Sequence, residues 1–162
     1  MYDNVMNKFK WGRMEEPDVI IEENNRRQIS IMDIRGMMSR LAEKLVAEGD
    51  KQKAQEVIKK CLTLMPPEKV SYDYTMLPVI NAMYSAELAA DANAICLQMA
   101  EEYDQILSWL DDLRRDGFYE QREFNMGLSI IGYLAQQLLD NGAEDAAEKV
   151  ADIYTKYAGM MQ

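Results

Sequence analysis

The feature that most constrains the fold is an internal match between two segments of the chain. Segment 40–57 reads RLAEKLVAEGDKQKAQEV and segment 133–150 reads YLAQQLLDNGAEDAAEKV, and the two align without a gap at an offset of 93 positions. Apolar residues recur at steps of three and four on both sides of a central glycine, which indicates two helices joined by a tight turn. The matched residues are Leu41, Ala42, Leu45, Gly49, Ala54 and Val57 in the first segment, and Leu134, Ala135, Leu138, Gly142, Ala147 and Val150 in the second. The chain therefore contains two copies of one helical hairpin.

The spacing of the small residues has a physical reason. Ala42 lets two antiparallel helices approach closely, Gly49 permits the turn, and Ala54 removes bulk where the second helix crosses the first. Segments 35–68 and 128–160 resemble the tetratricopeptide repeat, which has this pattern and a period of about 34 residues. The first copy also has the proline that this repeat carries after its second helix, at Pro66.

A further hairpin is expected between the two copies. Its residues Ile80, Tyr84, Ala92 and Cys96 fit the repeat only with a one-residue deletion. We predict an all-α fold of about six helices, stacked as antiparallel hairpins in a tetratricopeptide-like, right-handed α–α superhelix. The alternative is an irregular helical bundle. The predicted body spans 29–162, with repeats near 35–68, 72–113 and 119–160.

Residues 1–28 differ from the rest of the chain. A short helix is expected over Tyr2–Phe9, followed by Trp11, Pro17 and the β-branched run Val19–Ile21, which together favour an irregular or extended segment. We predict an N-terminal arm that packs on the helical body through its aromatic residues.

The charge of the chain argues against nucleic acid and anionic lipid as partners. The formal net charge is −10, and the only basic runs are the pairs Arg26-Arg27, Lys59-Lys60 and Arg114-Arg115. Nucleic-acid binders usually carry a basic patch or stripe. No stretch approaches the roughly 18 apolar residues that indicate a membrane span, so direct membrane insertion is not expected.

The residue types of most catalytic centres are missing. The sequence has no histidine, which excludes Ser-His-Asp and Cys-His nucleophile systems and the usual His-bearing metal sites. Cys61 and Cys96 both lie in helical apolar patterns, which favours two buried free thiols over a disulfide, although a disulfide stays open. We predict no catalytic residue, no cofactor and no metal, and therefore no enzyme.

The acidic pairs are the one feature that leaves room for metal-assisted chemistry. They are Glu15-Glu16, Glu22-Glu23, Glu101-Glu102 and Asp111-Asp112. Adjacent residues on a helix point about 100° apart and so seldom converge on one ion. Solvated helix surface is the favoured interpretation, and an acidic, metal-assisted enzyme is the alternative.

A partner-binding groove can be placed from the repeat frame and the aromatic residues. The candidate contact residues are Ser39, Glu43, Tyr72, Tyr74 and Tyr84. The groove positions supply no cation, so the clamp with which some tetratricopeptide domains hold a C-terminal carboxylate is not expected. The predicted partner is a protein or a peptide segment.

Several strings together resemble a narrower family. They are YDNVMNKFKWG at 2–12, EENNRR at 22–27, RLAEKLVAEGDKQKAQEVIKKCLTLMP at 40–66 and YDYTMLP at 72–78. They are similar to the C-terminal soluble region of a Bacteroidetes-type family of multi-spanning membrane proteins. The membrane half of that family resembles glycosyltransferases that use lipid-linked sugars, protein mannosyltransferases among them.

The resemblance implies a place and a role for the chain. It implies a detached tail on the periplasmic side of the inner membrane, with catalysis upstream; without the resemblance, a cytoplasmic location is expected. The predicted function is a non-catalytic protein-interaction domain that binds a protein segment or the membrane half of its parent. The alternative is a structural domain that braces its parent or self-associates as a homodimer.

Overall fold

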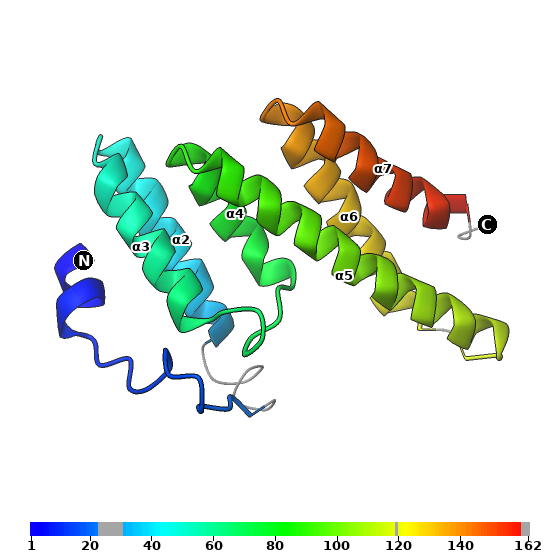
Figure 1. Cartoon of the computed structure of the whole chain (residues 1–162), viewed down its shortest axis with the longest axis horizontal. Helices are drawn as coiled ribbons and strands as arrows, with labels where there is room; N and C mark the ends of the chain where they lie inside the picture. Colours follow the sequence, from blue (N-terminus) through cyan, green and yellow to red (C-terminus); the bar gives the residue numbers. More distant parts are fainter. Residues whose placement is uncertain (23–30, 119, 160–162) are drawn as a thin grey trace. The chain divides into compact units, whose positions relative to one another are not determined.

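The computed structural model describes residues 1–22, 31–118 and 120–159, and within these ranges it contains helices and no strands (Figure 1). The α-helices are α2 (Ile31–Ala47), α3 (Lys51–Leu64), α4 (Leu77–Ser85), α5 (Ala89–Arg115), α6 (Gln121–Asp140) and α7 (Glu144–Ala158). Two short elements accompany them, a π-helix η1 (Asn4–Lys8) and a 3-10 helix η2 (Tyr74–Met76). The all-helical prediction is confirmed, and the six α-helices are those expected.

Prolines lie where α3 ends and where α4 begins. α3 ends at Leu64, just before Pro66-Pro67, because proline cannot donate the hydrogen bonds that would continue the helix. Pro78 lies in the first turn of α4, where its missing N–H has no helical partner to lose. The chain before α4 forms η2, because the Asp73 side chain accepts a hydrogen bond from the Thr75 N–H, and α4 begins at Leu77.

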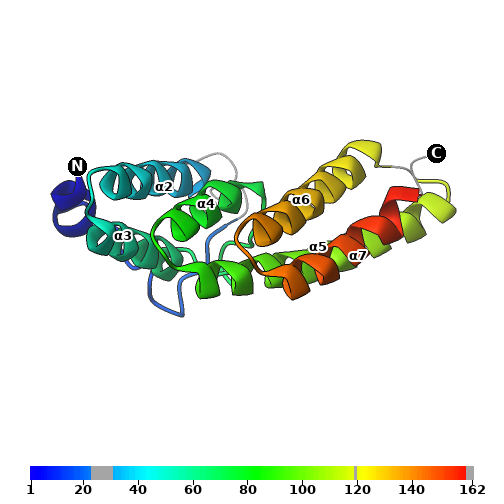
Figure 2. The ribbon, with the colours of Figure 1, turned by 90° about the horizontal axis from the view of Figure 1, so that it is seen from above.

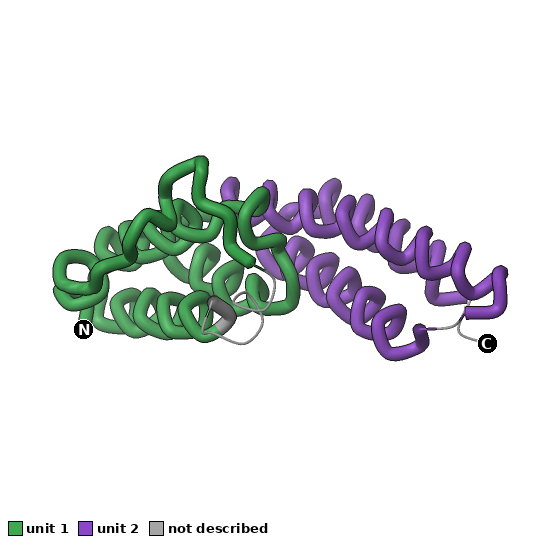
Figure 3. Tube along the Cα trace, turned by 90° about the horizontal axis from the view of Figure 1, so that it is seen from below, with its two compact units in different colours: residues 1–89 green, residues 90–162 purple. Residues whose placement is uncertain are grey.

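The chain divides into two compact units, residues 1–89 and 90–162 (Figure 3). In unit 1, α2 and α3 form an antiparallel hairpin, and α4 packs against both helices. The predicted middle hairpin falls across this division, since α4 belongs to unit 1 and α5 to unit 2.

The N-terminal arm of unit 1 contacts α3 and the loop that follows it. The Tyr2 hydroxyl bonds to Glu56, and Lys60 pairs with Glu15. The Val5 side chain is fully buried. The predicted segment after residue 22 lies outside the described residues.

In unit 2, α6 and α7 form the second antiparallel hairpin (Figure 2). α6 approaches α5 at Gly127, where a Cβ atom would stand 3.1 Å from Leu107 Cδ2. α7 is joined to α5 by the Tyr157 hydroxyl, which donates to Asp104 Oδ1 at 2.6 Å. Partial burial raises the pKa of Tyr157, and so does its hydrogen bond to Asp104.

The turn of the first hairpin has a defined hydrogen-bond pattern. Gly49 lies in the left-handed region at φ +85°. Its N–H donates to Val46 O at 2.9 Å, and the Asp50 N–H donates to Leu45 O at 2.9 Å. These bonds satisfy the last carbonyls of α2 and are those of a Schellman motif.

The turn of the last hairpin repeats this pattern residue for residue. Gly142 has φ +77°, its N–H donates to Leu139 O at 3.0 Å, and the Ala143 N–H donates to Leu138 O at 2.9 Å. Each of these residues lies 93 positions after its counterpart in the first turn. The internal match in the sequence is therefore also a match of local structure.

A third turn of this kind, at the end of α4, has Glu87 in place of glycine, at φ +64°. Its bonds run from Glu87 N–H to Tyr84 O at 3.1 Å and from Leu88 N–H to Met83 O at 2.9 Å. Met83 therefore stands where Leu45 stands in the first hairpin, and the buried Ala92 follows Glu87 by the spacing that separates Ala54 from Gly49. The deletion inferred from the sequence is wrong, because the turn fits the frame without one.

Candidate functional site

Two of the five predicted contact residues lie inside unit 1. Ser39 on α2 is buried, and its hydroxyl donates to Gly36 O at 3.0 Å. Tyr72 is also buried, with the Arg35 guanidinium carbon 5.5 Å from its ring centroid. Their side chains pack within the unit and leave little surface for a partner.

The other three predicted residues reach the surface to different degrees. Glu43 is exposed on α2, Tyr74 in η2 is 47% exposed, and Tyr84 on α4 is half-buried. The five residues thus come from α2, from the segment before α4 and from α4 itself. A role of Glu43, Tyr74 and Tyr84 in partner binding stays a prediction.

Sequence reasoning missed Arg35, which contacts Tyr72 and Asp73. Arg35 is only 2% exposed and donates to Val70 O at 2.8 Å, to Ser71 O at 3.1 Å and to Thr75 Oγ1 at 3.0 Å. It also lies 3.6 Å from the Asp73 carboxylate. The arginine fixes this segment to α2. Its place three residues before Met38, on the apolar side of the helix, was the available signal.

The titratable groups form no reactive centre within the part of the chain that the structure describes. No group of three or more Asp, Glu, Cys or His side chains is placed to hold a metal ion in those ranges. Cys61 and Cys96 are free and buried, and burial raises the pKa of the Cys61 thiol to about 12. Such a thiol is a poor nucleophile at neutral pH.

In unit 2, a groove with a volume of about 780 Å³ lies between α6 and α7. We call this the α6–α7 groove. Its apolar surface comes from Gly132, Ala135 and Leu139 of α6 and from Ala147, Ala151 and Tyr154 of α7, and its polar rim includes Gln136, Glu144 and Glu148.

The α6–α7 groove combines exposed apolar side chains with hydroxyls that are already hydrogen-bonded. Leu139 is 53% exposed and Tyr154 is 39% exposed, so large apolar side chains face solvent beside small ones. The two aliphatic hydroxyls at the groove are bonded to their own helices, Ser129 to Asn125 O and Thr155 to Ala151 O. Contiguous exposed apolar patches rimmed by polar residues mark interaction sites more often than single exposed apolar residues do.

Comparison of the chain with protein-family models, with curated proteins and with solved structures finds no match. No helix in the described ranges is both long enough and apolar enough to cross a membrane.

Proposed function

We propose that this chain is a non-catalytic protein-interaction domain that binds its partner on the α6–α7 groove. The observation that carries the proposal is the exposure of Leu139 and Tyr154 beside the small residues of that groove. Hairpins that resemble tetratricopeptide repeats support it, because such repeats stack in a superhelix and present extended binding surfaces.

The proposal extends to the setting of the chain through the family resemblance given above. The domain would be the C-terminal tail of a membrane glycosyltransferase-like protein, on the periplasmic side. Its partner would be a protein segment or the membrane half of the parent. The acidic balance, with a net charge of −10, favours a partner surface that carries basic residues.

A structural, self-associating domain is the second candidate. The observation that favours it is again the exposed apolar pair, since two copies could bury Leu139 and Tyr154 against each other. Sedimentation velocity separates the two candidates. A sedimentation coefficient that stays at the monomer value as concentration rises argues against self-association.

The test of the proposed function is a capture experiment with matched variants. The tagged domain is incubated with detergent-solubilised envelope, and the bound proteins are identified by mass spectrometry. Ala151→Glu places a charge in the groove, and Ala94→Glu adds the same charge at an exposed position of α5 outside it. A partner that is lost with Ala151→Glu and kept with Ala94→Glu supports the proposal. Equal recovery by all three proteins rejects the groove.

A further inference from the structure

The first hairpin shows how a covered groove of this type is built. The groove residues Gly132, Ala135, Ala147, Ala151 and Tyr154 correspond, 93 positions earlier, to Ser39, Ala42, Ala54, Ile58 and Cys61. Each of the five earlier residues is 2% exposed or less. In unit 1, α4 packs against both α2 and α3 (Figure 1). The face that is open in the last hairpin is thus buried in the first, where a helix packs on the hairpin.

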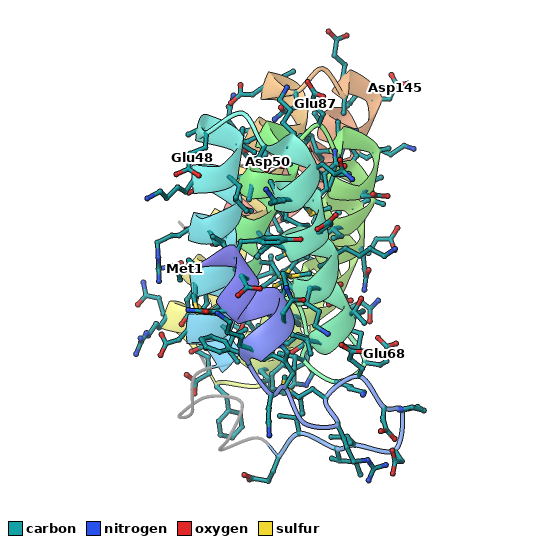
Figure 4. The ribbon with its side chains drawn as sticks, turned by 90° about the vertical axis from the view of Figure 1, so that its left-hand side faces the viewer. Met1, Glu48, Asp50, Glu68, Glu87 and Asp145 are labelled. Carbon is teal, nitrogen blue, oxygen red and sulfur yellow. The ribbon has the colours of Figure 1, made fainter. Side chains whose placement is uncertain are left out.

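The polar contacts of α4 show how its end is held. Lys51 Nζ pairs with Glu87 at 2.5 Å, and Gln55 Nε2 donates to Ala86 O at 2.8 Å. Glu87 lies at the same end of unit 1 as Asp50, where α2 turns into α3 (Figure 4). A lysine of the hairpin therefore meets an acidic residue at the C-terminal end of the packed helix.

The last hairpin carries a carboxylate at each of these two positions, in place of one cation and one neutral amide. The counterparts of Lys51 and Gln55 are Glu144 and Glu148, both exposed on the rim of the groove. The C-terminal end of a helix carries a partial negative charge, so two carboxylates beside it are unfavourable unless a cation lies between them. An occupant that resembles α4 in position must differ from it in charge.

Resting on the proposed function, we propose that the α6–α7 groove binds an amphipathic helix of a partner protein. The helix lies on α6 and α7 as α4 lies on α2 and α3, and it carries Lys or Arg at its C-terminal end, beside Glu144 and Glu148. A second copy of this chain fits less well, because it carries the same charge of −10 and its α4 already packs on its own α2 and α3.

The chain itself supplies the probe that tests this inference. A labelled synthetic peptide of residues 74–88 with Glu87→Lys is titrated with the full chain and followed by fluorescence anisotropy. The Lys peptide is expected to bind about tenfold more tightly than the same peptide with Glu87, since a close charge pair replaces a repulsion. The Glu144→Lys variant of the chain is expected to reverse this preference.

Three controls locate the binding and its conformation. Ala151→Glu in the chain is expected to weaken binding of the Lys peptide at least tenfold, and Ala94→Glu is expected to leave it unchanged. Ala82→Pro in the Lys peptide is expected to abolish binding, because proline breaks the helix. Circular dichroism confirms that each variant of the chain is folded.

The opposite results overturn the inference in distinguishable ways. Absence of saturable binding, or equal affinity for the Lys and Glu peptides, rejects the basic helix. Binding that survives Ala82→Pro indicates an extended occupant, and a dimer that Ala151→Glu dissociates assigns the groove to a second copy. If Ala151→Glu still abolishes capture of a partner but neither peptide binds, the proposed function is retained and the helical occupant is rejected.

Discussion

The first and last hairpins, α2–α3 and α6–α7, share one local structure and differ in what lies on them. Both turn at a left-handed glycine, Gly49 or Gly142, with the same hydrogen bonds. In the first hairpin, α4 packs on one side and the N-terminal arm contacts α3. In the last hairpin, the corresponding face is the α6–α7 groove.

The difference teaches which residues define a hairpin and which define its surroundings. Val57 and Val150 are both fully buried, because they pack where the two helices of each hairpin meet. Lys51 and Glu144 occupy matching positions yet carry opposite charges, because they lie on the rim. The two hairpins therefore share their interior residues and differ at rim residues, and the rim residues determine which segment can pack on each hairpin.

The largest effect is expected where the two hairpins use opposite chemistry at one position. Arg35 corresponds to the buried Leu128 of the last hairpin. Arg35→Leu is expected to lower the free energy of unfolding by about 3 kcal/mol, because the buried Val70 carbonyl, the Ser71 carbonyl and the Thr75 hydroxyl lose a donor. Urea denaturation measures the loss, and hydrogen exchange is expected to show it in residues 70–76.

Arg40→Leu is the matched control, since Arg40 is exposed on the same helix. Its effect is expected to stay within about 0.5 kcal/mol. If Arg35→Leu changes stability no more than Arg40→Leu does, Arg35 does not hold the segment before α4.

A second pair of variants compares helix packing in the two units. Gly127→Ala is expected to cost about 1–2 kcal/mol, because the new methyl would stand 3.1 Å from Leu107 Cδ2 and 3.3 Å from Tyr103 Cδ1, both of buried side chains. Gly36→Ala on α2 meets only the end of the Arg40 side chain, at 3.4 Å. It is expected to stabilise by up to about 1 kcal/mol through helix propensity. Thermal unfolding measures the change in melting temperature of each variant. Changes of the same sign in Gly127→Ala and Gly36→Ala would contradict the packing difference.

A third comparison concerns the turns. Gly49→Ala and Gly142→Ala are each expected to cost about 1 kcal/mol, because alanine is strained in the left-handed region. Glu87→Gly is expected to stay within about 0.5 kcal/mol of the original chain, because relief of that strain is offset by loss of the exposed Lys51 ion pair and by a more flexible unfolded chain. Chemical denaturation measures all three. A gain from either alanine variant would show that the shared turn does not depend on glycine.

The sequence predicts this fold well where periodicity and turn residues agree. The helices of the first and last hairpins follow from apolar spacing around Gly49 and Gly142. The middle turn was misplaced because Glu87 carries no glycine signal, although its backbone takes the same conformation. A residue other than glycine can adopt a left-handed φ at a moderate cost in free energy, and a turn pattern based on glycine does not detect it.

The site was less predictable, because exposure depends on which helix covers which face. Ser39 was assigned to a groove from the repeat frame, and it is buried in the unit where α4 packs on α2. The sequence analysis did not predict the α6–α7 groove, although two differences between the aligned hairpins indicate it. Ile58 is replaced by Ala151, and Lys51 by Glu144, within otherwise matched helices.

The smallest expected effect tests a polar contact that only the last hairpin has. Tyr157 and Lys156 on α7 bond to Asp104 on α5, whereas the counterpart of Tyr157 in the first hairpin is the buried Leu64. Partial burial opposes the charge on Asp104, but hydrogen bonds from Lys156 and Tyr157 outweigh it and lower the pKa of this carboxyl. A lowered pKa in the folded state means that the stabilisation is complete above the ordinary carboxyl pKa, about 3.9, and is lost as the pH falls through the folded value.

Asp104→Asn is therefore expected to cost about 0.5 kcal/mol at pH 7, a small value because the carboxyl is partly exposed and screened by solvent. The difference from the original chain is expected to shrink as the pH falls below about 4, where the carboxyl gains a proton. Hydrogen exchange of the α7 amides measures it, with Asp152→Asn on the exposed side of α7 as control. A cost that is the same at pH 7 and pH 3 would mean that the Tyr157 hydroxyl needs only an acceptor. The charge on Asp104 would then contribute nothing to holding α7 on α5.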